Sequence, residues 1–269
     1  GFKGVIFGTQ ATKELCKILL LDSAKIQAGD LKYENKKRQQ RNQPLLKALY
    51  DEDDVLQAME YFVAVDYHNP TRLTDDVTVE FIDAGHIIGS ACVHIRVTEN
   101  GKTKCITFSG DIGRYRDVIL KSPETFPQAD VIIMESTYGN SLHDLQTTTP
   151  DHLLEWIEKV CVQRGGKLII PAFSVGRTQE ILYALNQLEV ERRLPDLDYF
   201  VDSPLSIEAT ELVKSYPQYF NKTIQHLLQT DNDPFHFNGL KYVKTVEESK
   251  LLNFRNGPCV IISASGMAD

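Results

Sequence analysis

The sequence lacks the features that mark several large classes of protein. Five cysteines are spread over 269 residues without a CxxC pair, so neither a disulfide scaffold nor a cysteine zinc cluster is expected. No apolar run approaches the roughly 18 residues that a membrane span requires. The first residues, GFKGVIFGTQ, do not resemble a signal peptide. These absences predict a cytoplasmic protein with reduced thiols and no membrane partner.

Positive charge is also scarce, with 29 Lys and Arg against 37 Asp and Glu, a net charge of −8. This balance argues against sequence-independent coating of DNA, but it allows an enzyme that binds a few phosphates locally. The polar stretch 29–54 contains a basic run, KKRQQR, and an acidic run, DEDD. We favour a solvated helical excursion with charged faces, and a nucleic-acid contact at the basic run is the alternative.

The middle of the chain alternates with a period of two, as half-buried strands do. Two such strands flank the turn at Asn100-Gly101, which is a strong hairpin signal. Val93 and Ile95 share one face of the first strand, and Cys92 and His94 share the other. We therefore expect His94 on the surface of the sheet rather than among metal ligands.

After residue 128 strands and helices alternate, which predicts a parallel α/β sheet. The strands read ADVIIME, KLIIPA, LDYFVDS and PCVIISAS, and the first is apolar enough for cover on both faces. Helix starts are indicated by Thr149-Pro150, by Ser203-Pro204 and by a capping box of Thr245 and Glu248. The fold class is therefore α/β.

Polar side chains follow several predicted strands, where α/β proteins assemble their sites. They are His86, Asp111, Glu135, Ser174 and Arg177. Four of them have an ordinary alternative: His86 as a loop histidine, Asp111 as a turn aspartate, Glu135 as a solvated glutamate, and Arg177 as an arginine that pairs with a buried carboxylate. Together they fit a metal site, because imidazole and carboxylate are zinc ligands.

The segments DAGHIIGSA, FSGDIGR, ESTYGN, PAFSVGRTQE and ISASGM occur in this order along the chain. In this combination they resemble the β-CASP branch of the metallo-β-lactamase-fold nucleases, which includes RNase J and the endonuclease of polyadenylation. The resemblance implies part of a metallo-β-lactamase αββα fold over residues 1–139. It implies a β-CASP parallel α/β domain over residues 140–269.

The resemblance also implies a site that holds two zinc ions and hydrolyses RNA phosphodiester bonds. His86 matches a zinc ligand, and Asp111 matches the aspartate that bridges the metals. Glu135 matches the acidic residue that orients a later histidine near the leaving group. Two metals about 3.5–4 Å apart supply a nucleophile and charge stabilisation for this reaction. Ser174, Arg177, Ser265 and Gly266 would contact the substrate.

The chain departs from the family pattern in two places. The metal-binding motif HxHxDH is absent, and the sequence ends at SGMAD, ahead of the family's last histidines. We therefore interpret the chain as an internal fragment that keeps only His86 and Asp111 as zinc ligands and is inactive alone. A catalytic zinc typically needs three protein ligands.

Other functions stay open from the sequence. The leading hypothesis is a zinc-dependent ribonuclease, acting as an endonuclease or an exonuclease in RNA processing or decay. The alternatives are a non-catalytic β-CASP scaffold that binds RNA and a DNA-acting nuclease of the same family. A small-substrate hydrolase with the metallo-β-lactamase fold fits less well, since the region after residue 140 resembles β-CASP. A homodimer is compatible with each of these.

Overall fold

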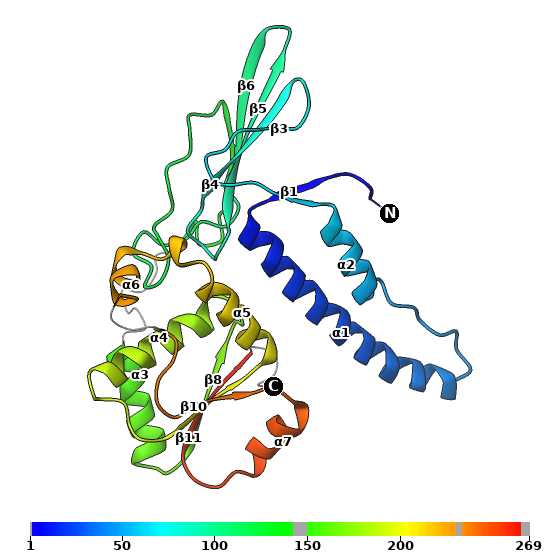
Figure 1. Cartoon of the computed structure of the whole chain (residues 1–269). Coiled ribbons are helices and arrows are strands. Elements are labelled where there is room, and N and C mark those ends of the chain that lie inside the picture. The colour runs from blue at the N-terminus through cyan, green and yellow to red at the C-terminus, as the bar shows by residue number, and fades with distance from the viewer. Residues whose placement is uncertain (1, 142–149, 230–232, 265–269) are drawn as a thin grey trace. The chain divides into compact units, whose positions relative to one another are not determined.

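A computed structural model describes residues 2–141, 150–229 and 233–264 of the chain. The chain divides into two compact units (Figure 1). The first is Gly1–Ile112 with Pro123–Met134, and the second is Gly113–Ser122 with Glu135–Asp269. The segment Gly113–Ser122 lies in the predicted first domain but joins the second unit, where the backbone of Lys121 donates a hydrogen bond to Tyr219. The two-domain assignment itself stays a prediction.

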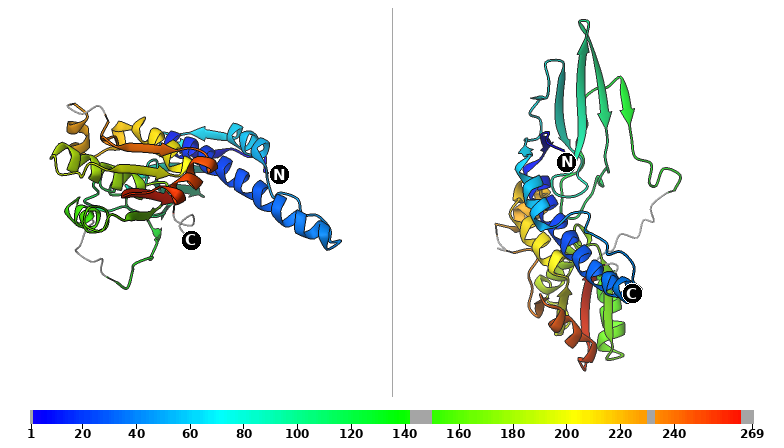
Figure 2. Two further views of the ribbon diagram at one scale, coloured as in Figure 1. Left: turned by 90° about the horizontal axis from the view of Figure 1, so that it is seen from below. Right: turned by 90° about the vertical axis from the view of Figure 1, so that its right-hand side faces the viewer.

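The first unit combines one long helix with a mainly antiparallel sheet. A hydroxyl cap starts the helix α1, because Thr9 Oγ1 accepts a hydrogen bond from the amide of Thr12. Beyond it lies α2, which packs on α1. Figure 2 shows the two helices as a pair that extends away from the sheet. The elements are β1 (Ile6–Gly8), α1 (Gln10–Gln40), α2 (Glu52–Glu60), β2 (Phe62–Ala64), β3 (Thr71–Arg72), β4 (Val77–Asp83), β5 (Ala91–Glu99), β6 (Lys102–Phe108) and β7 (Val131–Ile133).

The five-stranded sheet has the order β3-β4-β5-β6-β7, and only its last pair, β6 with β7, is parallel. The predicted hairpin between β5 and β6 is confirmed. Asn100 and Gly101 at its turn both have positive φ, at 51° and 71°, as a two-residue hairpin of the primed type requires. β1 and β2 form a separate parallel pair.

The expected surface position of His94 is wrong. The residue is 1% exposed, and its Nδ1 lies 2.8 Å from Thr107 Oγ1. Alternation along β5 separates two faces without saying which one is covered. Phe126 packs against the buried cluster that includes Cys92, which shares the His94 face. Burial first, and then the charge of Arg96, lowers the pKa of His94.

The expected cover on both faces of the strand at 129–135 is wrong for the described residues. Val131, Ile132 and Ile133 of β7 are 48%, 50% and 52% exposed. The strand pairs with β6 and has no second neighbour among the residues that the structure describes. Successive side chains of a strand point to opposite faces, so their shared exposure shows that neither face of β7 is fully covered by the described residues.

The second unit is built on a fully parallel sheet with the order β10-β9-β11-β8, which confirms the predicted fold class. Capping fixes its helix starts as expected: Ser203 caps α5 ahead of Pro204, and Thr245 and Glu248 form a capping box on α7. Thr149 lies outside the described residues. The helices and strands are α3 (Pro150–Ile157), the π-helical turn η1 (Glu158–Val162), β8 (Lys167–Ala172), α4 (Arg177–Val190), β9 (Asp198–Asp202), α5 (Pro204–Lys214), the 3-10 turn η2 (Pro217–Tyr219), α6 (Lys222–Leu227), β10 (Leu240–Val243), α7 (Val246–Phe254) and β11 (Cys259–Ala264).

The core of the second unit is apolar and aromatic. Tyr199, Phe220 and Phe235 are fully buried, as are Leu182 and Leu185 on α4. All five cysteines of the chain are free thiols. Among the described residues, no helix combines the length and the apolar character that crossing a membrane would need.

Candidate functional site

The loop that carries His86 is held by hydrogen bonds within its own few residues. At its start the Asp83 carboxylate accepts a hydrogen bond of 2.8 Å from the amide of Gly85. At its end Ser90 Oγ accepts hydrogen bonds from the amides of His86 and Ile87, at 3.1 and 3.3 Å. These contacts satisfy the backbone locally, and they leave the imidazole of His86 half exposed.

Gly89 docks this loop on the start of α1. The hydroxyls of Thr9 and Thr12 lie 2.9 and 2.8 Å from the Gly89 carbonyl oxygen. Gly89 has a φ of +82°, and a Cβ atom there would lie 2.7 Å from the backbone nitrogen of Thr12. Only glycine fits this approach. Sequence reasoning missed this docking, although the glycine beside Ser90 was a signal for it.

Asp111 reaches the same edge of the sheet from β6. β4 and β6 are each antiparallel to β5, so they run in the same direction and end at the same edge. His86 follows the end of β4 and Asp111 follows the end of β6. The His86 Nε2 and Asp111 Oδ2 atoms lie 3.7 Å apart, with exposed fractions of 44% and 69% for the two side chains. The structure therefore brings together an imidazole and a carboxylate that are both open to a ligand.

The donor types of His86 and Asp111 suit zinc, but their number does not complete a site. Zinc in proteins is held by three or four such donors. Among the residues that the structure describes, no group of three or more His, Cys, Asp and Glu side chains is placed to hold a metal ion. The pair is thus an incomplete ligand set on its own.

Glu135 lies in the second unit, directly after Met134 of the first. It is half-buried, and its Oε2 accepts a hydrogen bond of 2.7 Å from the Thr137 hydroxyl. That hydrogen bond fixes the orientation of the carboxylate.

Arg177, at the first turn of α4, forms an ion pair with a carboxylate, which is the alternative to a substrate contact that the sequence left open. Its Nη1 lies 2.6 Å from Glu180 Oε2, and Arg114 lies 3.3 Å from the other oxygen of the same carboxylate. Burial raises the pKa of Glu180, and the two arginines oppose that rise. Arg177 stays 42% exposed, so it retains donors that face solvent.

Ser174 belongs to a buried polar network at the carboxyl ends of the parallel strands. The centre of the network is Gln179, whose Nε2 donates to the Ser174 carbonyl at 3.1 Å and to Thr210 Oγ1 at 2.8 Å. Its Oε1 accepts from the amide of Gly176 at 2.7 Å. The Ser174 hydroxyl lies 3.5 Å from Ser203 Oγ. Sequence reasoning missed Gln179, whose spacing from the helix-starting Gly176 was the available signal. Ser265 and Gly266 lie outside the described residues.

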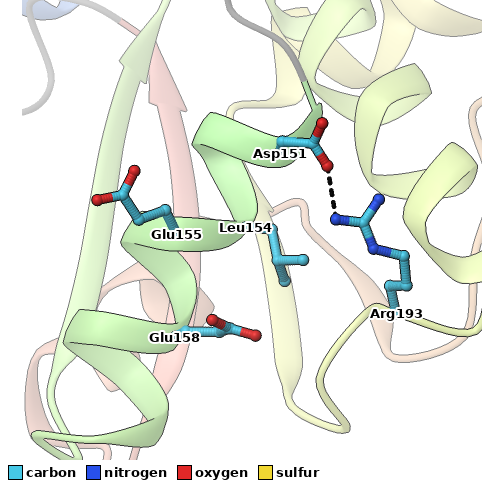
Figure 3. A pocket seen from close by; sticks show the side chains of 5 residues that line it. All are labelled: Asp151, Leu154, Glu155, Glu158 and Arg193. Atoms are coloured by element: carbon cyan, nitrogen blue, oxygen red, sulfur yellow. Dashed lines mark hydrogen bonds and ion pairs between the residues drawn. The ribbon is translucent and has the colours of Figure 1, made fainter.

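A shallow pocket of about 420 Å³ lies between α3 and the segment after α4 (Figure 3). Asp151, Glu155 and Glu158 line it on one side and Arg193 on the other. Arg193 is bound to Asp151 at 2.5 Å and to Glu191 at 2.8 Å. None of the predicted site residues lines this pocket, and its three carboxylates outnumber its one arginine.

Known proteins resemble this chain over nearly its whole length, including the segments that carry these site residues. Residues 178–269 match the family model described as the Beta-Casp domain. The chain belongs to the β-CASP family. This membership confirms the resemblance drawn from the sequence motifs, and the mixed α/β architecture agrees with a metallo-β-lactamase fold followed by β-CASP.

Relatives of this β-CASP chain occur in bacteria, archaea and eukaryotes. It is 34% identical over 268 residues to a ribonuclease of Thermus thermophilus, covering 99% of the chain and 56% of that protein. It is 34% identical to an RNase J-like protein of Methanocaldococcus jannaschii, over 82% of the chain and 50% of that protein. An endoribonuclease of Schizosaccharomyces pombe is 30% identical over 99% of the chain and 32% of its own length. The chain thus spans about half the length of the first two relatives.

Proposed function

We propose that the protein containing this chain is a zinc-dependent ribonuclease that hydrolyses RNA phosphodiester bonds. The observation that carries the proposal is the 3.7 Å approach of His86 and Asp111 at one edge of the sheet. The ribonuclease names of its bacterial and eukaryotic relatives support RNA as the substrate. The five free thiols support a reducing compartment such as the cytoplasm.

In this proposal His86 and Asp111 are two of the zinc donors, and at least one further donor comes from outside the described residues. Glu135, oriented by Thr137, holds a proton-carrying group near the leaving oxygen. Arg177, Ser265 and Gly266 contact the RNA backbone, whereas Ser174 is buried and belongs to the Gln179 network. Arg177 can do so while it pairs with Glu180, because its guanidinium carries five donors.

Cleavage of end-labelled RNA and DNA of one sequence by the full-length protein tests the substrate class. We expect cleavage of RNA and little of DNA, with the labelled ends separating internal cuts from removal of terminal nucleotides. Cleavage of DNA with RNA left intact would overturn the proposal. The variant Glu135→Gln should slow RNA cleavage and change its pH profile, since a carboxylate that positions a proton is lost. Glu208→Gln is the matched control, because Glu208 is exposed on α5.

The 269-residue chain alone offers a second test. Two donors do not hold a catalytic zinc tightly, so we expect weak zinc binding and no cleavage. Elemental analysis after extensive dialysis measures the metal content. One tightly bound zinc per chain would contradict the proposed ligand set.

A non-catalytic RNA-binding scaffold is the second candidate. The observation that favours it is the absence of any three-donor metal cluster among the described residues. RNA binding by the full-length protein without cleavage at any zinc concentration would favour the scaffold over the ribonuclease.

A further inference from the structure

The far end of α1 carries a concentration of positive charge that the proposed site does not use. Residues 30–47 hold six Lys and Arg against Asp30 and Glu34, in a chain whose net charge is −8. We name the segment Lys32–Lys47 the basic end of α1. It covers the last turns of the helix and the chain that follows.

Only part of this charge has an internal role. Arg38 pairs with Glu34 at 3.3 Å and donates to the Pro44 carbonyl, and Lys37 lies over the ring of Tyr33 at 4.1 Å. These two cations lie in the last turn, where they also complement the helix dipole. The other four side chains are exposed and form no ion pair with any described residue. They are Lys32, Lys36, Arg41 and Lys47.

The acidic run of α2 does not neutralise the basic end. After the helix ends, the chain returns alongside α1. The amide of Leu46 donates a hydrogen bond of 2.8 Å to Asn35 Oδ1, and the hydroxyl of Tyr50 donates one of 2.8 Å to Ser23 Oγ. Asp51, the N-cap of α2, therefore lies beside the middle of α1. Lys36 lies 13 helical positions beyond Ser23, about 20 Å at 1.5 Å per residue. The Debye length is about 8 Å in physiological salt, so the acidic run has little influence on Lys36 and Arg41, whereas Lys47 lies only four residues before Asp51.

The arrangement of the cations favours a phosphate backbone over a flat partner surface. Lys36, Lys37 and Arg38 are consecutive, so they point about 100° apart around the helix. A helix that lies on a membrane separates its charged and apolar faces instead. Exposed amide side chains stand among the cations, and such groups also bind phosphates and sugars. They are Gln39, Gln40, Asn42 and Gln43.

The two ends of α1 have different surroundings. Its first turn is docked on the His86 loop through the Gly89 carbonyl. Its basic end is about 45 Å away, at 1.5 Å for each of 31 residues. A stacked nucleic-acid strand advances 3.4 Å per nucleotide, so about 13 stacked nucleotides span this distance.

We propose that the basic end of α1 is an anchor for the RNA backbone, which binds a long RNA at a distance from the His86 and Asp111 pair. This inference rests on the proposed ribonuclease function for the identity of the nucleic acid. The anchor binds phosphates without reading sequence, and RNAs too short to reach it gain nothing from it.

The test compares two triple variants of the full-length protein that change its net charge equally. Lys36→Gln/Arg41→Gln/Lys47→Gln removes three unpaired cations of the anchor. Lys17→Gln/Lys102→Gln/Lys250→Gln removes three exposed lysines elsewhere that likewise have no partner in the described structure. Glutamine and lysine have similar helix propensities, and circular dichroism confirms that α1 is retained.

Fluorescence anisotropy measures binding of an RNA of about 30 nucleotides at several salt concentrations. Each lost phosphate contact lowers the salt slope by about 0.7 for single strands. The anchor variant should therefore bind about tenfold more weakly, with a slope smaller by about 2. The lysine control should bind as the wild type does. Equal binding by both variants would overturn the anchor.

Cleavage of an RNA of about six nucleotides separates the anchor from the proposed function. The anchor variant should cleave this short RNA at the wild-type rate, since it does not reach the basic end. Loss of short-RNA cleavage would contradict the proposal. Absence of cleavage by the wild type as well, with binding still lost in the anchor variant, would overturn the ribonuclease function alone.

Binding to vesicles that contain phosphatidylserine tests a membrane surface as the alternative partner of the basic end. Leu45 and Leu49 beside the basic end are 60% and 90% exposed, and leucine with lysine is a membrane-surface combination. We expect no difference between the two variants in vesicle binding. Vesicle binding lost in the anchor variant, with RNA binding intact, would replace RNA by a membrane surface.

Discussion

The polar residues near the strand ends of the two units differ in exposure and in hydrogen bonding. In the first unit His86 and Asp111 are exposed and lie 3.7 Å apart. In the second unit Gln179 is 1% exposed and makes three hydrogen bonds, at 2.7, 2.8 and 3.1 Å. Both donors and one acceptor position of this buried amide are occupied, so the side chain stabilises its surroundings and is not available to a ligand. His86 and Asp111, which we call the open pair, are instead exposed and keep atoms that can bind a ligand.

The difference separates residues that build the site from residues that would act in it. The Gln179 network fixes the start of α4 and so the position of Arg177. The His86 loop is fixed by hydrogen bonds from its backbone amides to Ser90. The imidazole of His86 therefore contributes little to the stability of the loop. Substitutions in the network should therefore change stability, and substitutions in the open pair should change activity.

The largest stability effect should come from Gln179→Leu. The change preserves the approximate size of the side chain but leaves the Gly176 amide and the Ser174 carbonyl without their partner. We expect the free energy of unfolding to fall by about 2–4 kcal/mol, measured by urea denaturation. Gln163→Leu is the matched control, because Gln163 is exposed, and it should change stability by less than about 0.5 kcal/mol. Equal effects would refute the network.

Gly89→Ala should rank next, and Gly101→Ala is its control. Both glycines have positive φ, at +82° and +71°, but only a Cβ at Gly89 would meet other atoms. The shared backbone strain costs about 1 kcal/mol. The clash with Thr9 and Thr12 should raise the cost at Gly89 to about 2–3 kcal/mol, measured by the same denaturation. A Gly89 variant no less stable than the Gly101 variant would show that the loop is not docked on α1.

Asp198→Asn should have a smaller effect that depends on pH. Asp198 is bound to Lys241 at 2.6 Å and also pairs with Arg255. The hydrogen bond from Lys241 contributes most to lowering the pKa of Asp198 below 3.8, and the charge of Arg255 adds to it. Stability from a lowered carboxyl pKa is present above the unfolded value and is lost as the pH falls through the folded value.

We therefore expect Asp198→Asn to lower the free energy of unfolding by about 1 kcal/mol at neutral pH. The difference from the wild type should shrink below about pH 4. Thermal unfolding at several pH values measures it. A difference that stays constant down to pH 2 would contradict the ion-pair explanation.

The smallest stability effect should come from His86→Ala. The side chain is half exposed and only its backbone holds the loop, so we expect a change below about 0.5 kcal/mol. Urea denaturation beside the wild type measures it. A loss above about 2 kcal/mol would mean that the imidazole is structural, and the contrast between the two strand ends would fail.

Local signals explain which parts of the fold were predictable. The hairpin at Asn100-Gly101 and the caps at Ser203 and Thr245 depend on a few neighbouring residues, so the sequence indicates them directly. The parallel sheet followed from the alternation of strands and helices. His86 and Asp111 were found because each directly follows a strand with a regular pattern.

The errors concern contacts that the local sequence does not contain. The burial of His94 is not encoded in the alternation of β5, because the chain that covers its face lies outside the strand: Phe126, far along the chain, packs against the neighbouring Cys92. Gln179 resembles an ordinary helical residue, and only the tertiary structure places Thr210 within 2.8 Å of it. The basic end of α1 was noticed as a charge run, but its separation from the acidic run required the course of residues 41–51.

The most direct test of the account is the rate of RNA cleavage by the full-length protein carrying Asp111→Asn. Removing the proposed zinc-bridging carboxylate should lower the rate by at least about 100-fold, since changes even in residues that only orient metal ligands cost 10–100-fold. Asp53→Asn, an exposed aspartate of α2, should cleave at the wild-type rate. An Asp111→Asn protein that cleaves RNA as fast as the Asp53→Asn protein would contradict the assignment of the site.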